Sequence, residues 1–167
     1  MIARIKSAVA ALEAGMTGWR RHLHQHPELS FHETDTVRYV VDLLRNEGIE
    51  VYDGVGRLNA DAPGTGAIAF VRGEKGKSDA CIAIRADLDA LPITEVGKEG
   101  YCSQNPGVMH ACGHDAHTAM VLGAGFALHR LRQEWSGTVM LVFQPGEEKE
   151  PGRSEEHTSE LQSRSVI

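Results

Sequence analysis

The segment with the clearest capacity for chemistry reads HACGHD, residues 110–115, and precedes a predicted helix. Thiolate and imidazole groups are zinc ligands, and those of Cys112 and His114 can share an ion if the backbone turns at Gly113. The positive end of a helix dipole favours a thiolate at Cys112. Asp115 can cap the helix or hold a ligand histidine in one tautomer. The segment is a candidate metal site; the alternative is a capped helix with an incidental cysteine and histidine.

Two adjacent carboxylates, Glu147 and Glu148, follow an apolar run at residues 138–143. That run predicts a strand buried on both faces, and functional groups in α/β sheets gather beyond the carboxyl ends of strands. One carboxylate could bind a metal ion, while the other takes a proton from an activated water and returns it to a leaving amine. The alternative is a solvated acidic loop, because charged residues continue after the pair.

A third candidate group is Asp87 and Asp89 in the segment RADLDALP, which follows another apolar run. Two residues apart in an extended segment, their side chains can point the same way. They could bind metal, orient a ligand or cap a turn.

Three histidines, His22, His24 and His26, alternate with other residues just before Pro27. On a helix this spacing spreads the side chains around the axis, so the three cannot converge on one ion. We interpret them as structural residues or as supports for the ligands.

Hydrophobic periodicity places these segments on alternating helices and strands. Apolar residues three and four apart predict helices at about residues 2–26, 34–47 and 115–133. Short apolar runs predict strands at 49–52, 66–72, 80–84 and 138–143, with a hairpin or a longer turn at 73–79. This alternation favours an α/β layered fold.

Composition narrows the class of protein. The chain has 167 residues, 41% of them hydrophobic, which is enough for one domain with a core. A net charge of −6 argues against nucleic acid as a partner. No apolar run could span a membrane, and the N-terminus lacks a signal-peptide pattern. Three cysteines at no disulfide spacing read as reduced thiols, so we expect a cytoplasmic protein.

The last 15 residues differ from the rest of the chain. From residue 153 the sequence reads RSEEHTSELQSRSVI and carries no apolar periodicity. This stretch resembles the translation of a sequencing-adapter oligonucleotide, which indicates a truncated gene record; the alternative is a natural polar tail. We expect residues 1–152 to form part of one catalytic domain and residues 153–167 a non-native or disordered tail.

Together, the segments HPELSFHE, RADLDALP, HACGHDAH and FQPGEE resemble the amidohydrolase branch of the aminoacylase/carboxypeptidase superfamily of dinuclear metallohydrolases. That branch includes hippurate hydrolases, indole-acetyl-amino-acid hydrolases and N-acetyl-diaminopimelate deacetylases. The resemblance implies a zinc-peptidase-like domain with a mostly parallel central sheet. It implies that Cys112, His114 and Glu148 bind metal and that Glu147 is the general base and acid. Asp89 joins Glu147 in the expected catalytic group, with a supporting role that it shares with Asp87.

The resemblance also implies two divalent ions, zinc or manganese, an N-acyl amino acid or related amide as substrate, and a homodimer for the full-length protein. Relatives supply two further histidine ligands downstream, so we expect this chain to have little activity. Two alternatives remain open: a non-catalytic metal-binding fragment, and a hydrolase with Cys112 as nucleophile and His114 as base.

Overall fold

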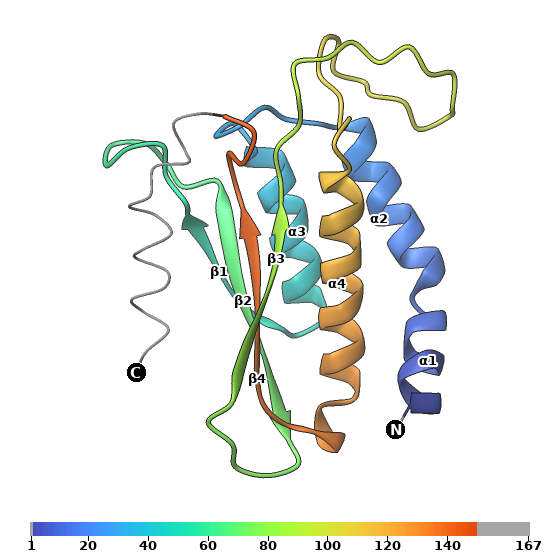
Figure 1. Ribbon diagram of the computed structural model, residues 1–167, viewed down its shortest axis with the longest axis vertical. Coiled ribbons are helices and arrows are strands. Elements are labelled where there is room, and N and C mark those ends of the chain that lie inside the picture. Colours follow the sequence, from blue (N-terminus) through green and yellow to red (C-terminus); the bar gives the residue numbers. More distant parts are fainter. Residues whose placement is uncertain (1, 150–167) are drawn as a thin grey trace.

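The computed structural model describes residues 2–149 and shows a sheet with helices layered on one of its faces (Figure 1). The elements in chain order are α1 (Ile2–Ala10), α2 (Glu13–Gln25), α3 (Thr34–Asn46), β1 (Glu50–Val55), β2 (Gly66–Glu74), β3 (Cys81–Asp87), α4 (His114–Arg130), the 3-10 helix η1 (Arg132–Glu134) and β4 (Ser136–Gln144). Helices α3 and α4 contact the sheet, while α1 and α2 pack on α4.

The four strands are ordered β1-β2-β4-β3. The α/β layered fold is confirmed, but the expected mostly parallel sheet is wrong. Within residues 2–149, β3 and β4 pair in parallel, whereas β1–β2 and β2–β4 are antiparallel. The reason lies in the connections: β3 and β4 are joined through α4, whereas no helix separates β1 from β2. Of the two alternatives at residues 73–79, the longer turn is correct, because β4 lies between β2 and β3.

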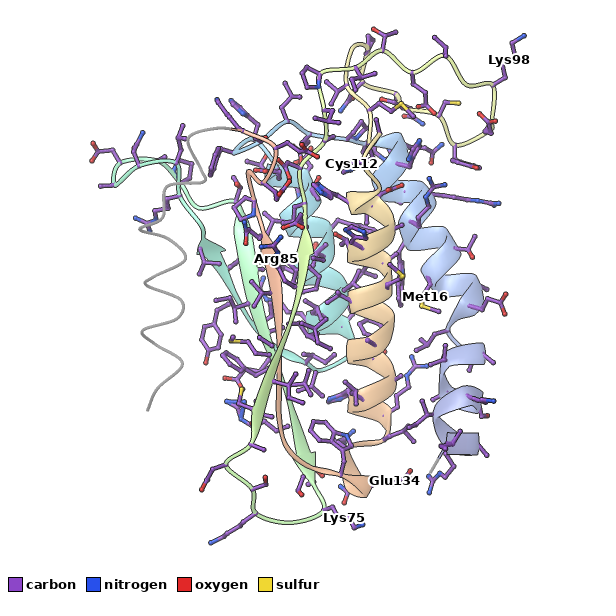
Figure 2. All side chains as sticks on the ribbon, in the orientation of Figure 1. Met16, Lys75, Arg85, Lys98, Cys112 and Glu134 are labelled. Atoms are coloured by element: carbon purple, nitrogen blue, oxygen red, sulfur yellow. The ribbon has the colours of Figure 1, made fainter. Side chains whose placement is uncertain are left out.

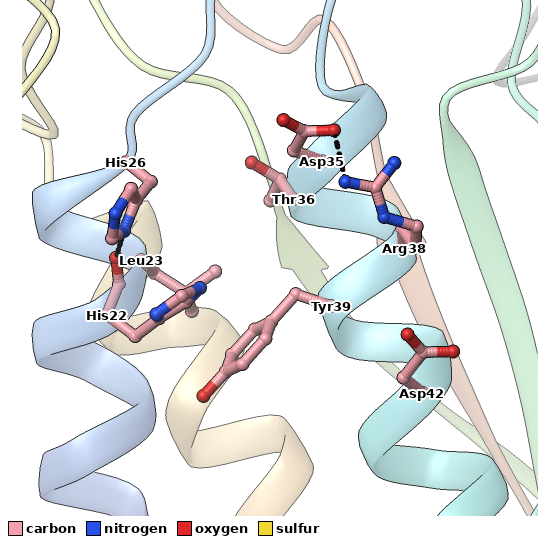
Figure 3. A pocket seen from close by; sticks show the side chains of 8 residues that line it. All are labelled: His22, Leu23, His26, Asp35, Thr36, Arg38, Tyr39 and Asp42. Atoms are coloured by element: carbon pink, nitrogen blue, oxygen red, sulfur yellow. Dashed lines mark hydrogen bonds and ion pairs between the residues drawn. The ribbon is translucent and has the colours of Figure 1, made fainter.

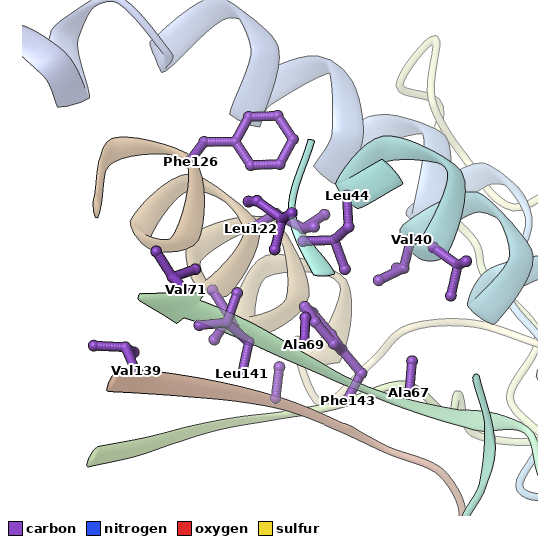
Figure 4. Close-up of a cluster of buried hydrophobic side chains, with 14 of the residues drawn as sticks. Val40, Leu44, Ala67, Ala69, Val71, Leu122, Phe126, Val139, Leu141 and Phe143 are labelled. Carbon is purple, nitrogen blue, oxygen red and sulfur yellow. The ribbon is translucent and has the colours of Figure 1, made fainter. Parts of the chain in front are cut away.

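The hydrophobic core lies between the sheet and α3 and α4 (Figure 4). Along β4, Val139, Leu141 and Phe143 point into it, and alternate residues on the other face are half-buried. The prediction that this strand is buried on both faces is therefore wrong for the part of the chain described, since the helices cover only one face of the sheet.

The N-terminal helix differs from its prediction because it breaks at residues 11–12 instead of running unbroken to Pro27. Leu12 at the break is buried in the core, whereas Ile2 and Ile5 in α1 are exposed. Helix α2 then approaches α4 closely at Gly123, where any Cβ would collide with the Met16 side chain. The Met16 side chain thus packs where Gly123 leaves α4 without a side chain.

Helix α4 is buried on two sides because it lies between the sheet and α2. Leu122 is fully buried, whereas Met120 on the remaining side is 59% exposed. The local pattern of apolar residues could not reveal the second buried side.

Within residues 2–149, no helix combines the length and the apolar character needed to cross a membrane. Residues 153–167, for which a separate tail was predicted, lie outside the described residues.

Candidate metal centre

The segments RADLDALP, HACGHDAH and FQPGEE meet at one end of the sheet. The parallel strands β3 and β4 end side by side, with Asp87 opposite Gln144, and the Leu88 amide donates to the Gln144 carbonyl at 2.9 Å. Helix α4 starts at the same end, and Figure 2 shows Cys112 just beyond it. Polar groups that follow β3 and β4 therefore face those that precede α4.

At this end, potential ligand atoms of Cys112, His114 and Glu148 all lie within 4.8 Å of one another. These are the three residues that we predicted to share an ion. A sulfur, an imidazole nitrogen and a carboxylate oxygen form a donor set that suits borderline divalent ions. The residues present fit such an ion, and the metal site stays a candidate on this geometry.

The ring of His114 is held in one orientation. Its Nδ1 donates to the Asp89 carbonyl at 2.9 Å and lies 3.2 Å from the Asp89 carboxylate. Its Nε2 faces the carboxylates of Glu148, at 3.9 Å, and Glu147, at 4.0 Å. Burial disfavours a charged ring, but the interactions with Asp89 outweigh it and raise the His114 pKa to about 9. Nε2 is thus the nitrogen available to an ion.

Asp89 is fully buried behind the candidate ligands. One carboxylate oxygen accepts from the Ser30 hydroxyl at 2.7 Å and from the Glu148 amide at 2.8 Å. Burial opposes its charge, yet hydrogen bonds from His114, Ser30 and Glu148 keep the Asp89 pKa below its ordinary value. We expected Asp89 in the catalytic group. Its carboxylate has no exposed surface and contacts the His114 ring and the Glu148 amide.

The surroundings of Cys112 do not favour a thiolate, contrary to the expectation from the helix dipole. Desolvation, followed by the interaction with the Glu148 carboxylate, raises its pKa to about 12. Helix α4 begins only at His114, with Gly113 as its N-cap at φ 92°, so Cys112 precedes the helix. A thiol with a raised pKa is poorly suited to act as a nucleophile without further activation.

A second group of potential ligands shares His114 with the first. Atoms of Asp87, His114 and His117 also lie within 4.8 Å of one another. Asp87 is buried and pairs with Arg85 at 3.2 Å, whereas His117 is exposed on α4.

Asp115 does not cap α4 through its side chain and does not contact a ligand histidine. Its buried carboxylate instead accepts from Arg20 at 2.8 Å and from His24 at 2.8 Å, both on α2. The other ring nitrogen of His24 lies 3.2 Å from Glu95 in the long loop after β3. The segment before Pro27 thus supports the start of α4, which agrees with the predicted structural role of His24.

The other two histidines of α2 lie apart from His24. The rings of His22 and His26 have centroids 4.5 Å apart, because residues four apart share a helix face. They border a pocket between α2 and α3, where Tyr39 stacks on His22 (Figure 3). As predicted, the three histidines do not converge on one point, although the rings of His22 and His26 lie side by side.

Sequence reasoning missed the roles of Ser30 and Glu33. Ser30 contacts Asp89, and the fully buried Glu33 contacts the Gly146 amide just before the paired glutamates. Both lie in the segment HPELSFHE, which we quoted only for its resemblance. A serine and a glutamate in a polar loop carry no local sign of burial. Only the family resemblance of the segment could have drawn attention to them.

The sequence matches the model of peptidase family M20/M25/M40 over residues 83–164. It is 42% identical over 153 residues to the N-acyl-L-amino acid amidohydrolase of Geobacillus stearothermophilus, covering 91% of this chain and 39% of that protein. The structure resembles that of the Bacillus subtilis YxeP protein, a dinuclear metal binding peptidase of family M20, with a TM-score of 0.74 and 42% identity over 83% of this chain and 36% of that one. It also resembles an aminohydrolase structure from methicillin-resistant Staphylococcus aureus, with a TM-score of 0.81 and 41% identity over 90% of this chain and 38% of that one. This chain therefore spans less than two fifths of the length of each of these relatives.

Proposed function

Since this chain belongs to peptidase family M20/M25/M40, we propose that it is part of a metal-dependent amidohydrolase that cleaves the amide bond of N-acyl amino acids or related small amides. The observation that carries the proposal is the convergence of Cys112, His114 and Glu148 within 4.8 Å. The name of the Geobacillus relative supports the substrate class, and the description of the YxeP protein supports metal binding.

In this proposal Cys112, His114 and Glu148 would hold one of two divalent ions, zinc or manganese. Asp89 orients the ring of His114 and fixes the backbone of Glu148. When bound, the ions supply Lewis acidity to an attacking water and to the scissile carbonyl.

Glu147 is the proposed general base and acid. Its carboxylate lies 4.0 Å from His114 Nε2, and its side chain keeps 30% of its surface exposed. A substrate and a water can therefore reach it. Glu147 takes a proton from the attacking water and later donates it to the leaving amine, which keeps that amine from departing as an unstable anion.

We also propose that the whole protein acts in the cytoplasm as a homodimer. The free state of Cys81, Cys102 and Cys112 is consistent with a reducing compartment. Support for the homodimer comes only from the family resemblance.

A cobalt titration of the 167-residue chain tests the metal site. We expect saturable binding and a sulfur-to-cobalt charge-transfer band that disappears in Cys112→Ser and weakens in Glu148→Gln. Cys81→Ser is the matched control, because Cys81 lies at the other end of β3 and should leave the band intact. A wild-type chain that binds cobalt without this band would contradict the proposed ligand set.

Hydrolysis separates the metal-dependent reading from the cysteine-nucleophile alternative. Any activity of the chain on an N-acetyl amino acid should stop with a chelator, return with added metal and vanish in Glu147→Ala. Activity that survives the chelator and disappears in Cys112→Ser would favour the nucleophile instead.

A further inference from the structure

The most unusual buried group outside the candidate ligands is the carboxylate of Glu33. Its side chain is fully buried, and no ion pair reaches it from any residue between 2 and 149. A buried carboxylate without a cation is costly to a fold unless hydrogen bonds stabilise it. Glu33 therefore needs a role that compensates for this cost.

Glu33 does not serve the helix that it begins. It occupies the N-cap position of α3, yet its side chain makes no capping hydrogen bond. The carboxylate of Glu28 does this instead, accepting from the amides of Asp35 and Thr36. The carboxylate of Glu33 points away from α3 and is free to bond elsewhere.

Both oxygens of Glu33 are bonded to segments far away in the sequence. Oε2 accepts from the Thr65 hydroxyl at 2.6 Å, and Oε1 accepts from the Gly146 amide at 2.8 Å. Gly146 immediately precedes Glu147 and Glu148. The carboxylate therefore connects the start of β2 to the loop that carries the proposed acid–base and ligand groups.

Asp89 makes a matching contact on the other side of Glu147. It accepts from the Glu148 amide and is itself bonded by Ser30, just as Glu33 accepts from the Gly146 amide and is bonded by Thr65. Two buried carboxylates, each bonded by a hydroxyl, thus hold the amides on either side of the Glu147 amide.

Phe31, which follows Ser30 in the sequence, also contacts this loop. Phe31 is the one non-glycine residue with a positive φ, 63°, among residues 2–149, and its ring lies where a Cβ at Gly146 would be. Backbone strain of this kind is found where the surrounding structure requires it, often at functional sites. Gly146 has a φ of 66° and admits the ring only because it lacks a side chain.

We propose that Glu33 is a positioning residue, whose buried carboxylate holds the Gly146 amide and thereby fixes the loop that presents Glu147 and Glu148. The proposal rests on the function proposed above for these two glutamates. In this proposal the length of the Glu33 side chain and its acceptor oxygen hold the Gly146 amide, and its negative charge is not required.

Two variants separate reach from charge. Glu33→Gln keeps the length and an acceptor oxygen, and its amide can donate to Thr65 if that hydroxyl rotates. Glu33→Asp keeps the charge but is one methylene shorter and cannot span Thr65 and Gly146 together. Glu28→Gln is the control, because it perturbs a carboxylate of the same region that does not contact the loop.

The first measurement needs no metal. Hydrogen exchange followed by NMR should show a protected Gly146 amide in the wild type, in Glu33→Gln and in Glu28→Gln. In Glu33→Asp we expect exchange faster by about tenfold or more, since a net hydrogen bond of about 1.4 kcal/mol corresponds to that factor. Equal protection in a folded Glu33→Asp, or its loss in a folded Glu33→Gln, would overturn the proposal.

The second measurement is the cobalt titration. Affinity should fall on the order of tenfold in Glu33→Asp and stay near the wild-type value in Glu33→Gln, because partners that orient a metal ligand commonly contribute this much. Unchanged affinity in Glu33→Asp would contradict the proposal. If the wild type binds no cobalt, the proposed function fails, and the exchange data alone decide whether Glu33 positions the loop.

Should Glu33→Asp not fold, Thr65→Val takes its place. It removes the hydroxyl that fixes the other oxygen of Glu33, so the Gly146 amide should exchange several-fold faster than in the wild type. A folded Thr65→Val with unchanged exchange would count against the proposal.

Discussion

The pairing of His114 with Asp89 predicts a pH-dependent contribution to stability in the metal-free chain. The perturbation is Asp89→Asn, which keeps the size of the side chain but removes the charge that His114 Nδ1 faces at 3.2 Å. One oxygen can still accept from Ser30 and Glu148, so the amide group is left facing the N–H of His114. The variant therefore removes mainly the interaction with His114.

The magnitude follows from the shift in pKa. His114 has a pKa of about 9, against an ordinary value of 6.5. A pKa raised in the folded state stabilises the fold fully below the unfolded value, and this stabilisation is lost as the pH rises through the folded value. A difference of two to three units corresponds to about 3 kcal/mol as an upper bound, because other groups also raise the pKa.

Urea unfolding in the presence of a chelator measures the effect. At pH 6, Asp89→Asn should lower the free energy of unfolding by as much as about 3 kcal/mol, and by pH 10 most of the difference should be gone. Asp53→Asn is the control, since Asp53 is in an exposed ion pair with Arg45 and its loss should cost at most about 1 kcal/mol at either pH.

Two results would refute this reasoning. One is a His114 ring that titrates near 6.5 in the NMR spectrum of the metal-free wild type. The other is a destabilisation by Asp89→Asn that is the same at pH 6 and pH 10, which would mean that hydrogen bonds other than the one to His114 dominate.

Three further substitutions test the packing and the buried network. Leu141→Ala removes a fully buried side chain from the core and should cost about 2–5 kcal/mol in urea unfolding; a loss below 1 kcal/mol would mean that β4 is not central to the core. Gly123→Ala should destabilise by about 1–3 kcal/mol through its collision with Met16, and the double variant with Met16→Ala should recover part of the loss in a thermal melt. Ser30→Ala removes a hydroxyl donor 2.7 Å from the buried Asp89 carboxylate and should cost about 1–3 kcal/mol, with an unchanged melting temperature as the contrary outcome.

The sequence by itself predicted most of the helices and strands and, through the family resemblance, the three candidate metal ligands. Apolar periodicity placed α3, β2, α4 and β4 within a few residues of their ends in the structure, because spacing along the chain reflects burial of one side of an element. Residue chemistry drew attention to Cys112 and His114 and to the adjacent pair Glu147 and Glu148, since few side chains can bind a divalent ion. Only the family resemblance assigned Glu148 to the ion and Glu147 to proton transfer.

The tertiary structure decided which strands pair in parallel, which faces are covered and what each buried carboxylate contacts. Asp115 bonds to α2 instead of capping α4, and Glu33 bonds to an amide 113 residues away. Periodicity and capping patterns are local, whereas the partner of a buried charge is whichever donor the fold brings beside it. The physical reason for the difference is that desolvation requires such a partner without specifying where in the sequence it lies.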